Sequence, residues 1–155
     1  MHDAFRRHVE SLHPSFDALL AFPPFTFGAM PKQLPTAGVY LFSEGERHLY
    51  VGRTNNVRRR LQQHCRASSS HNSAPFAFRL AREERNVLKA TYRVEGSRSH
   101  LSQDAAFSQS FIKAKARLCA MHVRVVAEHE PLRQALLEMY VAVSLAAPYN
   151  DFDNH

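Results

Sequence analysis

The sequence predicts an α+β fold in which a small β-sheet is accompanied by several helices. Two strand candidates flank a short polar turn, which is typical of a β-hairpin, and a third strand candidate follows at residues 122–127. The segments before, between and after them have helical spacing of apolar residues. The 155-residue chain fits one domain of ordinary size, and 45% hydrophobic with 22% charged residues is typical of a globular protein.

The first 35 residues predict a helical arm that precedes the sheet. Apolar residues recur at helical spacing from Asp3 to Phe22, and Pro14 marks the point where one helix would become two. Pro23-Pro24 ends this segment. We therefore expect residues 1–35 to form an N-terminal helical extension and residues 36–155 to form the main domain.

The predicted hairpin places two tyrosines on facing strands. Residues 39–42 and 48–51 are the strand candidates, and Gly45 lies in the polar turn between them. If Gly45 is the centre of the turn, Tyr40 lies opposite Tyr50, and both hydroxyls project from one face of the sheet. A cross-strand tyrosine pair is also a common way to stabilise a hairpin, so by itself it does not indicate chemistry.

The segment after the hairpin predicts three helices. Thr54-Asn55-Asn56 offers N-cap residues for a helix from Val57 to about Arg66. A helical insertion at about residues 67–120 follows, with helices over 75–89 and 103–120. Arg60 and His64 are four residues apart in the first of these helices, so both should face one ligand.

The last predicted helix, from Pro131 to about Ala146, follows the strand candidate His122–Ala127. Its central stretch is apolar nearly all round, which predicts a buried helix, and Glu138 is the one charged residue inside that stretch. A buried carboxylate needs a cation, a strong partner or a route to solvent. A divalent metal and a nearby arginine both satisfy this requirement.

The chain carries a formal charge of +6 and has a sequence pI of about 9.7, which favours a polyanionic partner such as nucleic acid. Glu83 and Glu84 lie beside two of the arginines, so a solvated helix face is an alternative interpretation of part of this charge. The candidate nucleic-acid contacts are Arg53, Arg58, Arg59, Arg66, Arg79 and Arg82.

The cysteines and the hydropathy indicate a soluble intracellular protein, and we expect it in the cytoplasm. Cys65 and Cys119 form no C-x-x-C pair, and no His/Cys cluster has the spacing of a structural zinc site. The N-terminus has no apolar segment of a signal peptide, and no apolar run approaches the roughly 20 residues that span a bilayer. We therefore expect no membrane contact.

Five short motifs occur in one order along the chain. They are Gly38-Val39-Tyr40, Tyr50-Val51-Gly52, Arg60 with His64 one turn later, Glu138 within an apolar helix, and Asn150 in Pro148-Tyr149-Asn150. Together they resemble the motifs of the GIY-YIG nuclease family, including the nuclease domain of the bacterial nucleotide-excision-repair incision subunit and the homing and restriction endonucleases of this family. Valines stand where the two half-motifs that name the family have isoleucine.

The resemblance implies a small three-stranded antiparallel sheet flanked by helices, here with the N-terminal helical arm and the helical insertion. It implies a metal-dependent endonuclease that hydrolyses DNA phosphodiester bonds with one Mg²⁺ or Mn²⁺ on Glu138, in repair or restriction. Tyr40 is the preferred general base, and Tyr50 and His64 are the alternatives. The implied catalytic residues are Tyr40, Tyr50, Arg60, His64, Glu138 and Asn150, with Gly38 and Gly52 as structural motif residues. A module that keeps the fold and binds nucleic acid without cutting it is the alternative function, and the sequence gives no oligomeric state.

Overall fold

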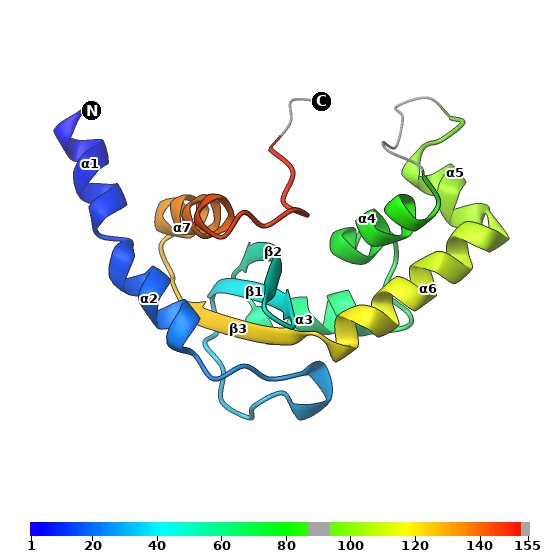
Figure 1. The fold of residues 1–155 in the computed structure, drawn as a ribbon, viewed down its shortest axis with the longest axis horizontal. Coiled ribbons are helices and arrows are strands. Elements are labelled where there is room, and N and C mark those ends of the chain that lie inside the picture. The colour runs from blue at the N-terminus through cyan, green and yellow to red at the C-terminus, as the bar shows by residue number, and fades with distance from the viewer. Residues whose placement is uncertain (87–93, 153–155) are drawn as a thin grey trace. The chain divides into compact units, whose positions relative to one another are not determined.

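The computed structural model describes residues 1–86 and 94–152. They form two compact units, one of Met1–Arg60 with Met121–His155 and the other of Leu61–Ala120. The first unit contains a three-stranded antiparallel sheet flanked by helices, which confirms the predicted α+β class (Figure 1).

The sheet has the strand order β2-β1-β3, so the first strand of the hairpin is the central strand. Strand β1 is Gly38–Glu44, β2 is Arg47–Thr54 and β3 is His122–Ala127, and β1 pairs antiparallel with both neighbours. All three predicted strands are confirmed. Because β2 is an edge strand, its outer side is open to other parts of the chain.

The predicted register of the hairpin is wrong by two residues at Tyr40. Tyr40 pairs with Gly52, and Tyr50 pairs with Phe42, because the register shifts after Phe42 and leaves Leu49 as an extra residue in β2. The two tyrosines are therefore diagonal neighbours instead of direct partners. They still lie on one face of the sheet, with ring centroids 6.4 Å apart.

The N-terminal residues form two helices, as predicted, with Pro14 at the start of the second. Helix α1 is Asp3–Glu10 and has no buried residue, whereas α2, His13–Ala21, packs on the sheet. A short 3₁₀ helix, η1, follows at Phe27–Ala29. The buried core that this segment shares with the sheet and the last helix contains Leu12, Leu19, Val39, Leu41, Val51, Leu137 and Val141. The division at residue 35 remains a prediction.

Phe25 makes a contact that the sequence did not predict. Its backbone N–H donates to the carbonyl of Val123 at 3.1 Å, and the N–H of Val123 donates to the carbonyl of Phe25 at 2.7 Å. This isolated bridge covers the outer edge of β3 at that position. The segment after α2 is therefore anchored to the sheet by backbone hydrogen bonds as well as by apolar packing.

Helix α7, Pro131–Ser144, packs on β1 and β2. The Glu130 carboxylate caps it by accepting hydrogen bonds from the backbone N–H groups of Leu132 and Arg133. The expectation that this helix is buried all round is wrong, because Met139 is 51% exposed and Val143 is 67% exposed. The sheet and α2 pack against α7, and Met139 and Val143 lie outside these contacts on its solvent side.

The second unit consists of helices. Helix α3, Val57–Cys65, starts in the first unit, and α4 (Pro75–Glu84), α5 (Arg98–Gln103) and α6 (Ala105–Ala120) belong to the second. Rings from α4 and α6 meet in its core, with the centroids of Phe78 and Phe107 5.0 Å apart.

Two details of this unit differ from the sequence prediction. Helix α4 ends at Glu84, because Asn86 adopts a left-handed backbone with φ 56°. The remainder of the helix predicted there, residues 87–89, lies outside the described residues. Helix α5 was not predicted. Within residues 1–86 and 94–152, no helix has the length and apolar character needed to cross a membrane.

Candidate active site

The two motif glycines are required by close approaches within the sheet. A Cβ atom on Gly38 would collide with the backbone carbonyl of Val126 in β3, and a Cβ atom on Gly52 would collide with the Tyr40 side chain. Tyr40 and Gly52 are direct partners across the hairpin. The absence of a side chain at Gly52 therefore makes room for the Tyr40 ring on this face.

Tyr40, Tyr50 and Arg60 form the centre of the candidate site. Helix α3 is positioned by a hydrogen bond from the Val57 N–H to the Thr36 carbonyl, 2.8 Å long, just before β1. One turn into the helix, the Arg60 Nε donates to the Tyr40 hydroxyl at 3.3 Å. The strand pair and the helix therefore bring a phenol pair and a guanidinium together.

Burial changes the acid–base chemistry of both tyrosines. Tyr40 is 1% exposed, and desolvation, reinforced by the nearby Tyr50, raises its pKa far above the ordinary value. Desolvation also raises the pKa of Tyr50, while Arg60 and a hydrogen bond from Tyr40 oppose this rise. Tyr50 is therefore the hydroxyl of this pair that accepts hydrogen bonds from both Tyr40 and Arg60.

Arg60 stays charged in this setting. Desolvation by itself lowers its pKa, but the charge and hydrogen-bond interactions with Tyr40 and Tyr50 outweigh that effect and raise it. A guanidinium offers five N–H donors in a planar fork, a geometry that suits an anionic ligand.

Glu138 of α7 is paired with Arg53 of β2. The Arg53 Nε donates to the Glu138 Oε2 at 3.0 Å, and the two side chains are 46% and 27% exposed. Burial raises the pKa of the Glu138 carboxyl, whereas the charges of Arg53 and Arg60 lower it. The carboxylate therefore has both a charged partner and a route to solvent, and either one alone meets the need that its position in an apolar helix predicted.

The Glu138 carboxylate offers oxygen ligands, which magnesium prefers, whereas structural zinc is held by sulfur and nitrogen ligands. No cluster of three or more His, Cys, Asp and Glu side chains occurs among residues 1–86 and 94–152. A hard cation that keeps several water ligands is commonly held by one or two carboxylates. The Glu138 oxygens are hard ligands at a partly exposed position, so this residue fits Mg²⁺ or Mn²⁺ with water completing the coordination.

Asn150 closes the outer edge of β2 with its side chain. Its Oδ1 accepts from the Val51 N–H and its Nδ2 donates to the Val51 carbonyl, each at 2.8 Å. The amide thus takes the place of a neighbouring strand beside Tyr50 and Gly52. Tyr149 adds a backbone hydrogen bond to the Leu49 carbonyl at 3.1 Å, so the segment after α7 is held along the same edge.

His64 lies one turn after Arg60 on α3 and is fully buried. It falls in the second unit, whereas Tyr40, Tyr50, Arg60 and Glu138 all fall in the first.

The predicted nucleic-acid contacts occupy different environments. Arg59 and Arg66 are exposed, and Arg79 and Arg82 are partly exposed on α4. Arg58 donates to the carbonyls of Pro31 and Lys32 at 2.6 and 2.8 Å and also contacts the sulfur of Met30. We therefore expect Arg58 to hold the segment before β1, and Arg53 to act with Glu138.

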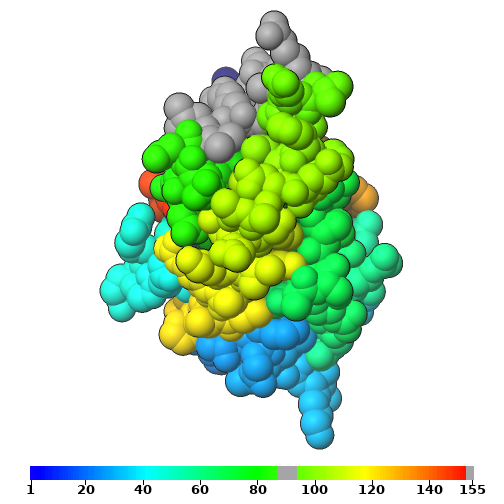
Figure 2. All heavy atoms as spheres, turned by 90° about the vertical axis from the view of Figure 1, so that its right-hand side faces the viewer, coloured from blue at the N-terminus to red at the C-terminus, as the bar shows by residue number. Residues whose placement is uncertain are grey.

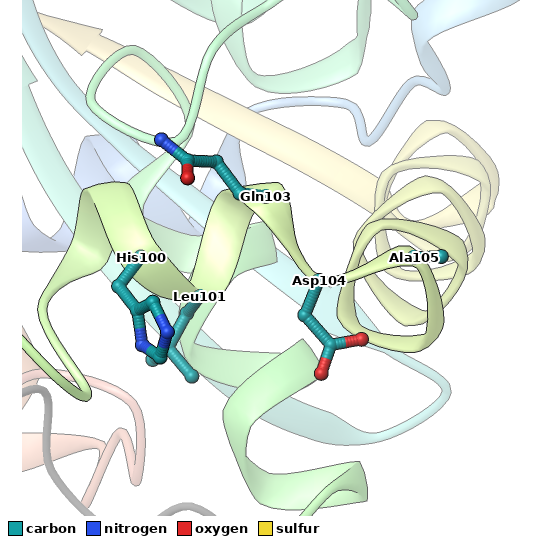
Figure 3. A pocket seen from close by; sticks show the side chains of 5 residues that line it. All are labelled: His100, Leu101, Gln103, Asp104 and Ala105. Carbon is teal, nitrogen blue, oxygen red and sulfur yellow. The ribbon is translucent and has the colours of Figure 1, made fainter.

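A surface hollow in the second unit shares no residue with this site. It is lined by His100, Leu101, Gln103, Asp104 and Ala105 at the junction of α5 and α6 (Figure 3). The Asp104 Oδ1 accepts hydrogen bonds from the backbone N–H groups of Ala106 and Phe107, and the His100 Nδ1 accepts from that of Gly96. These two polar side chains of the hollow therefore cap a helix and stabilise a turn, which explains their presence there.

Comparison with known proteins gives one family. The family model of the GIY-YIG catalytic domain matches residues 36–117, which is more than half of the chain. The matched segment contains both glycines, both tyrosines, Arg60 and His64, while Glu138 and Asn150 follow it. No curated protein and no solved structure matches the chain. On its motifs, its sheet and this match, the chain belongs to the GIY-YIG catalytic domain family and has a nuclease-type fold.

Proposed function

We propose that this chain is a metal-dependent endonuclease that hydrolyses phosphodiester bonds of DNA. The observation that supports it most is the convergence of Tyr40, Tyr50 and Arg60, in which a charged guanidinium contacts a buried phenol pair. Phosphodiester cleavage depends mainly on positioning and on neutralising negative charge. A site that combines a fixed cation with proton-carrying hydroxyls meets both needs.

Glu138 is the residue that holds the metal in this proposal. A bound Mg²⁺ or Mn²⁺ supplies positive charge to the phosphate and to the departing 3′ oxygen. Arg53 hydrogen-bonds one carboxylate oxygen, which fixes the orientation of the Glu138 side chain. Asn150 keeps the edge of β2 in place below it.

Arg60 contacts a non-bridging phosphate oxygen. Its raised pKa keeps it protonated throughout, and its bond to Tyr40 fixes the direction of the guanidinium. Charge-assisted hydrogen bonds of this kind are about twice as strong as neutral ones. Arg60 therefore stabilises the charge that accumulates when the water oxygen attacks phosphorus.

Tyr50, instead of Tyr40, is our choice for the group that takes the proton of the attacking water. The Tyr50 phenolate accepts hydrogen bonds from Tyr40 and Arg60, whereas complete burial keeps Tyr40 protonated. The water oxygen forms a bond to phosphorus, its proton passes to the Tyr50 oxygen, and the bond from phosphorus to the 3′ oxygen breaks. The 3′ oxygen takes a proton from solvent. Tyr40 stays a hydrogen-bond donor that orients Tyr50.

The experiment incubates purified chain with supercoiled plasmid, single-stranded circular DNA and a structured RNA, in Mg²⁺, Mn²⁺ or EDTA. Glu138→Ala and Arg60→Ala remove the two central charges. Glu46→Ala and Arg47→Ala are matched controls, because Glu46 lies in the hairpin turn, Arg47 begins β2, and both residues are exposed. We expect metal-dependent cutting of DNA that both site variants lose and both controls keep.

Two results would contradict this proposal. The first is an absence of cutting on every substrate although nucleic acid is bound, which would favour the non-cutting binding module. The second is cutting that persists in both site variants at the rate of the controls, which would show that the reaction takes place elsewhere.

A further inference from the structure

The net positive charge of the chain lies in one of its two units. Residues 1–60 and 121–155 contain ten Lys and Arg and ten Asp and Glu, so their formal charges cancel. Residues 61–120 contain ten Lys and Arg against four Asp and Glu, a formal charge of +6. The unit that holds Tyr40, Arg60 and Glu138 therefore carries no formal net charge, whereas the helical unit carries the net charge that attracts a polyanion.

Two basic side chains of the helical unit serve its own structure. Lys115 is 3% exposed, and its Nζ donates to the carbonyls of Ala67 and Ser69 and lies 4.5 Å from the centroid of the Phe111 ring. The guanidinium of Arg98 lies 4.8 Å from the centroid of the Phe78 ring. These two cations hold a loop and a helix, so they leave the charge of the surface to other residues.

Helix α4 has a mixed surface. Arg79 and Arg82 are only partly exposed, and Glu83 and Glu84 follow them in the same helix with exposed side chains. Carboxylates beside the arginines reduce the potential that a phosphate would meet there. The predicted contacts on α4 are for this reason weaker candidates than an exposed helix face whose own residues include Lys and Arg and no carboxylate.

The outer face of α6 is such a face. Gln109, Lys113 and Arg117 follow each other at intervals of four residues and are all exposed, so they line one side of the helix. No Asp or Glu occurs between Ala105 and Ala120. The exposed residues around them are mostly alanines, whose small side chains let a partner molecule approach the helix closely. Figure 2 shows α6, in yellow-green to yellow, on the surface that faces the viewer. The members of the α6 face are Ala105, Ala106, Gln109, Ile112, Lys113, Ala116, Arg117 and Ala120.

We propose that the α6 face binds the phosphate backbone of the nucleic acid, independently of its base sequence. This inference rests on the proposed function for the identity of the polyanion. Lys113 and Arg117 are one helical turn apart, about 6 Å along the axis, so each reaches a different phosphate. Contacts to phosphate release condensed counterions and carry no sequence information. The helical unit thereby supplies the affinity that the neutral catalytic unit lacks.

The test compares two variants that each remove two charges from an exposed helix. Lys113→Gln with Arg117→Gln changes the α6 face, and Arg6→Gln with Arg7→Gln changes α1 as the matched control. Both variants keep residues that favour helix, and circular dichroism checks their folding. The probe is a short fluorescein-labelled DNA duplex, its single strand, or a duplex of scrambled sequence, measured by fluorescence anisotropy in EDTA over a series of salt concentrations.

We expect the α6 variant to bind all three probes about tenfold more weakly at low salt. For the duplex, the slope of log K against log salt concentration should become shallower by about 1.8, which corresponds to the loss of two phosphate contacts. The control should bind within about twofold of the wild type with an unchanged slope. Charge-conserving exchange, Lys113→Arg with Arg117→Lys, should restore binding.

Wild-type affinity and slope in the α6 variant would overturn this inference, as would an equal loss in the control. Cutting of plasmid by the wild type in Mg²⁺ separates this outcome from a failure of the proposed function. If the wild type cuts DNA and the α6 variant binds DNA normally, only the assignment of the phosphate-binding surface to α6 is contradicted. A chain that binds through α6 and never cuts contradicts only the proposed nuclease activity.

Discussion

At the scale of single residues, the two halves of the hairpin motif have different physical roles. Gly38 allows β1 and β3 to approach, and Gly52 allows the Tyr40 ring to lie across β2. Tyr40 is then so deeply buried that it stays a proton donor, while Tyr50 receives hydrogen bonds from Tyr40 and Arg60. Small differences in burial thus separate two chemically identical side chains.

The separation of the tyrosines predicts different effects of removing each hydroxyl. In our proposal Tyr50→Phe removes the proton acceptor and lowers kcat by about 100- to 10,000-fold. Because the pKa of Tyr50 is raised, its deprotonated form is scarce at neutral pH and increases as pH rises, so the wild-type rate should rise with pH. Single-turnover cleavage from neutral to alkaline pH measures both quantities.

Tyr40→Phe is the comparison for this experiment. It removes a donor to Tyr50 and should lower the rate while leaving its rise with pH in place. A pH-independent rate in Tyr40→Phe, together with a normal pH profile in Tyr50→Phe, would show that Tyr40 is the base. The affinity for DNA in EDTA should be the same in both variants.

Gly52→Ala tests the packing of the Tyr40 ring. The new Cβ atom would overlap the Tyr40 hydroxyl and ring, so we expect a loss of about 1–3 kcal/mol in the free energy of unfolding. Gly28→Ala is the matched control, because a Cβ atom at that position meets no atom within 4 Å among the described residues. Urea denaturation measures both, and equal stability of the two variants would contradict the proposed role of Gly52.

At the scale of secondary structure elements, β2 is an edge strand that is closed by a side chain. Asn150 forms both hydrogen bonds that a neighbouring strand would form with Val51. Strand edges with open backbone groups are otherwise exposed to water or to other chains. The segment after α7 therefore holds β2 in the position that Tyr50 and Arg53 need.

Asn150→Ala should open this edge. The backbone N–H and carbonyl of Val51 lose their partners, and we expect a loss of about 1–3 kcal/mol in the free energy of unfolding. Asn150→Asp keeps the acceptor for the Val51 N–H but loses the donor to the Val51 carbonyl. Its free energy of unfolding should therefore lie between those of the wild type and Asn150→Ala. Hydrogen exchange of the Val51 amide, measured by NMR, should be faster in Asn150→Ala, and unchanged protection would contradict this role.

At the scale of the whole molecule, the sequence predicted the class of the fold, its three strands and most of its helices. These follow from local periodicity, turn residues and caps. The hairpin register was not predictable, because the extra residue Leu49 in β2 is selected by packing and not by the turn. The exposure of Met139 and Val143 also depends on tertiary structure, since the apolar sequence of α7 does not show which of its sides the sheet and α2 cover.

The candidate site was predictable in part for the same reason. The short motifs identify Tyr40, Tyr50 and Arg60 as candidates, but the pairing of Arg53 with Glu138 joins residues 85 positions apart. Arg58 looked equivalent to its neighbours, and only its bonds to Pro31 and Lys32 distinguish it. The missed charges of α6 did leave a signal, because Lys113, Lys115 and Arg117 occur in a helix without acidic residues.

The measurement that tests the central claim most directly is the single-turnover rate at which the wild type and Glu138→Gln cleave one labelled DNA in Mg²⁺. The glutamine keeps the shape of the side chain and removes its charge. We predict a rate lower by about 100- to 1,000-fold with unchanged binding in EDTA. Cleavage by Glu138→Gln at the wild-type rate, or cleavage by the wild type that persists in EDTA, would contradict a metal-dependent nuclease centred on this carboxylate.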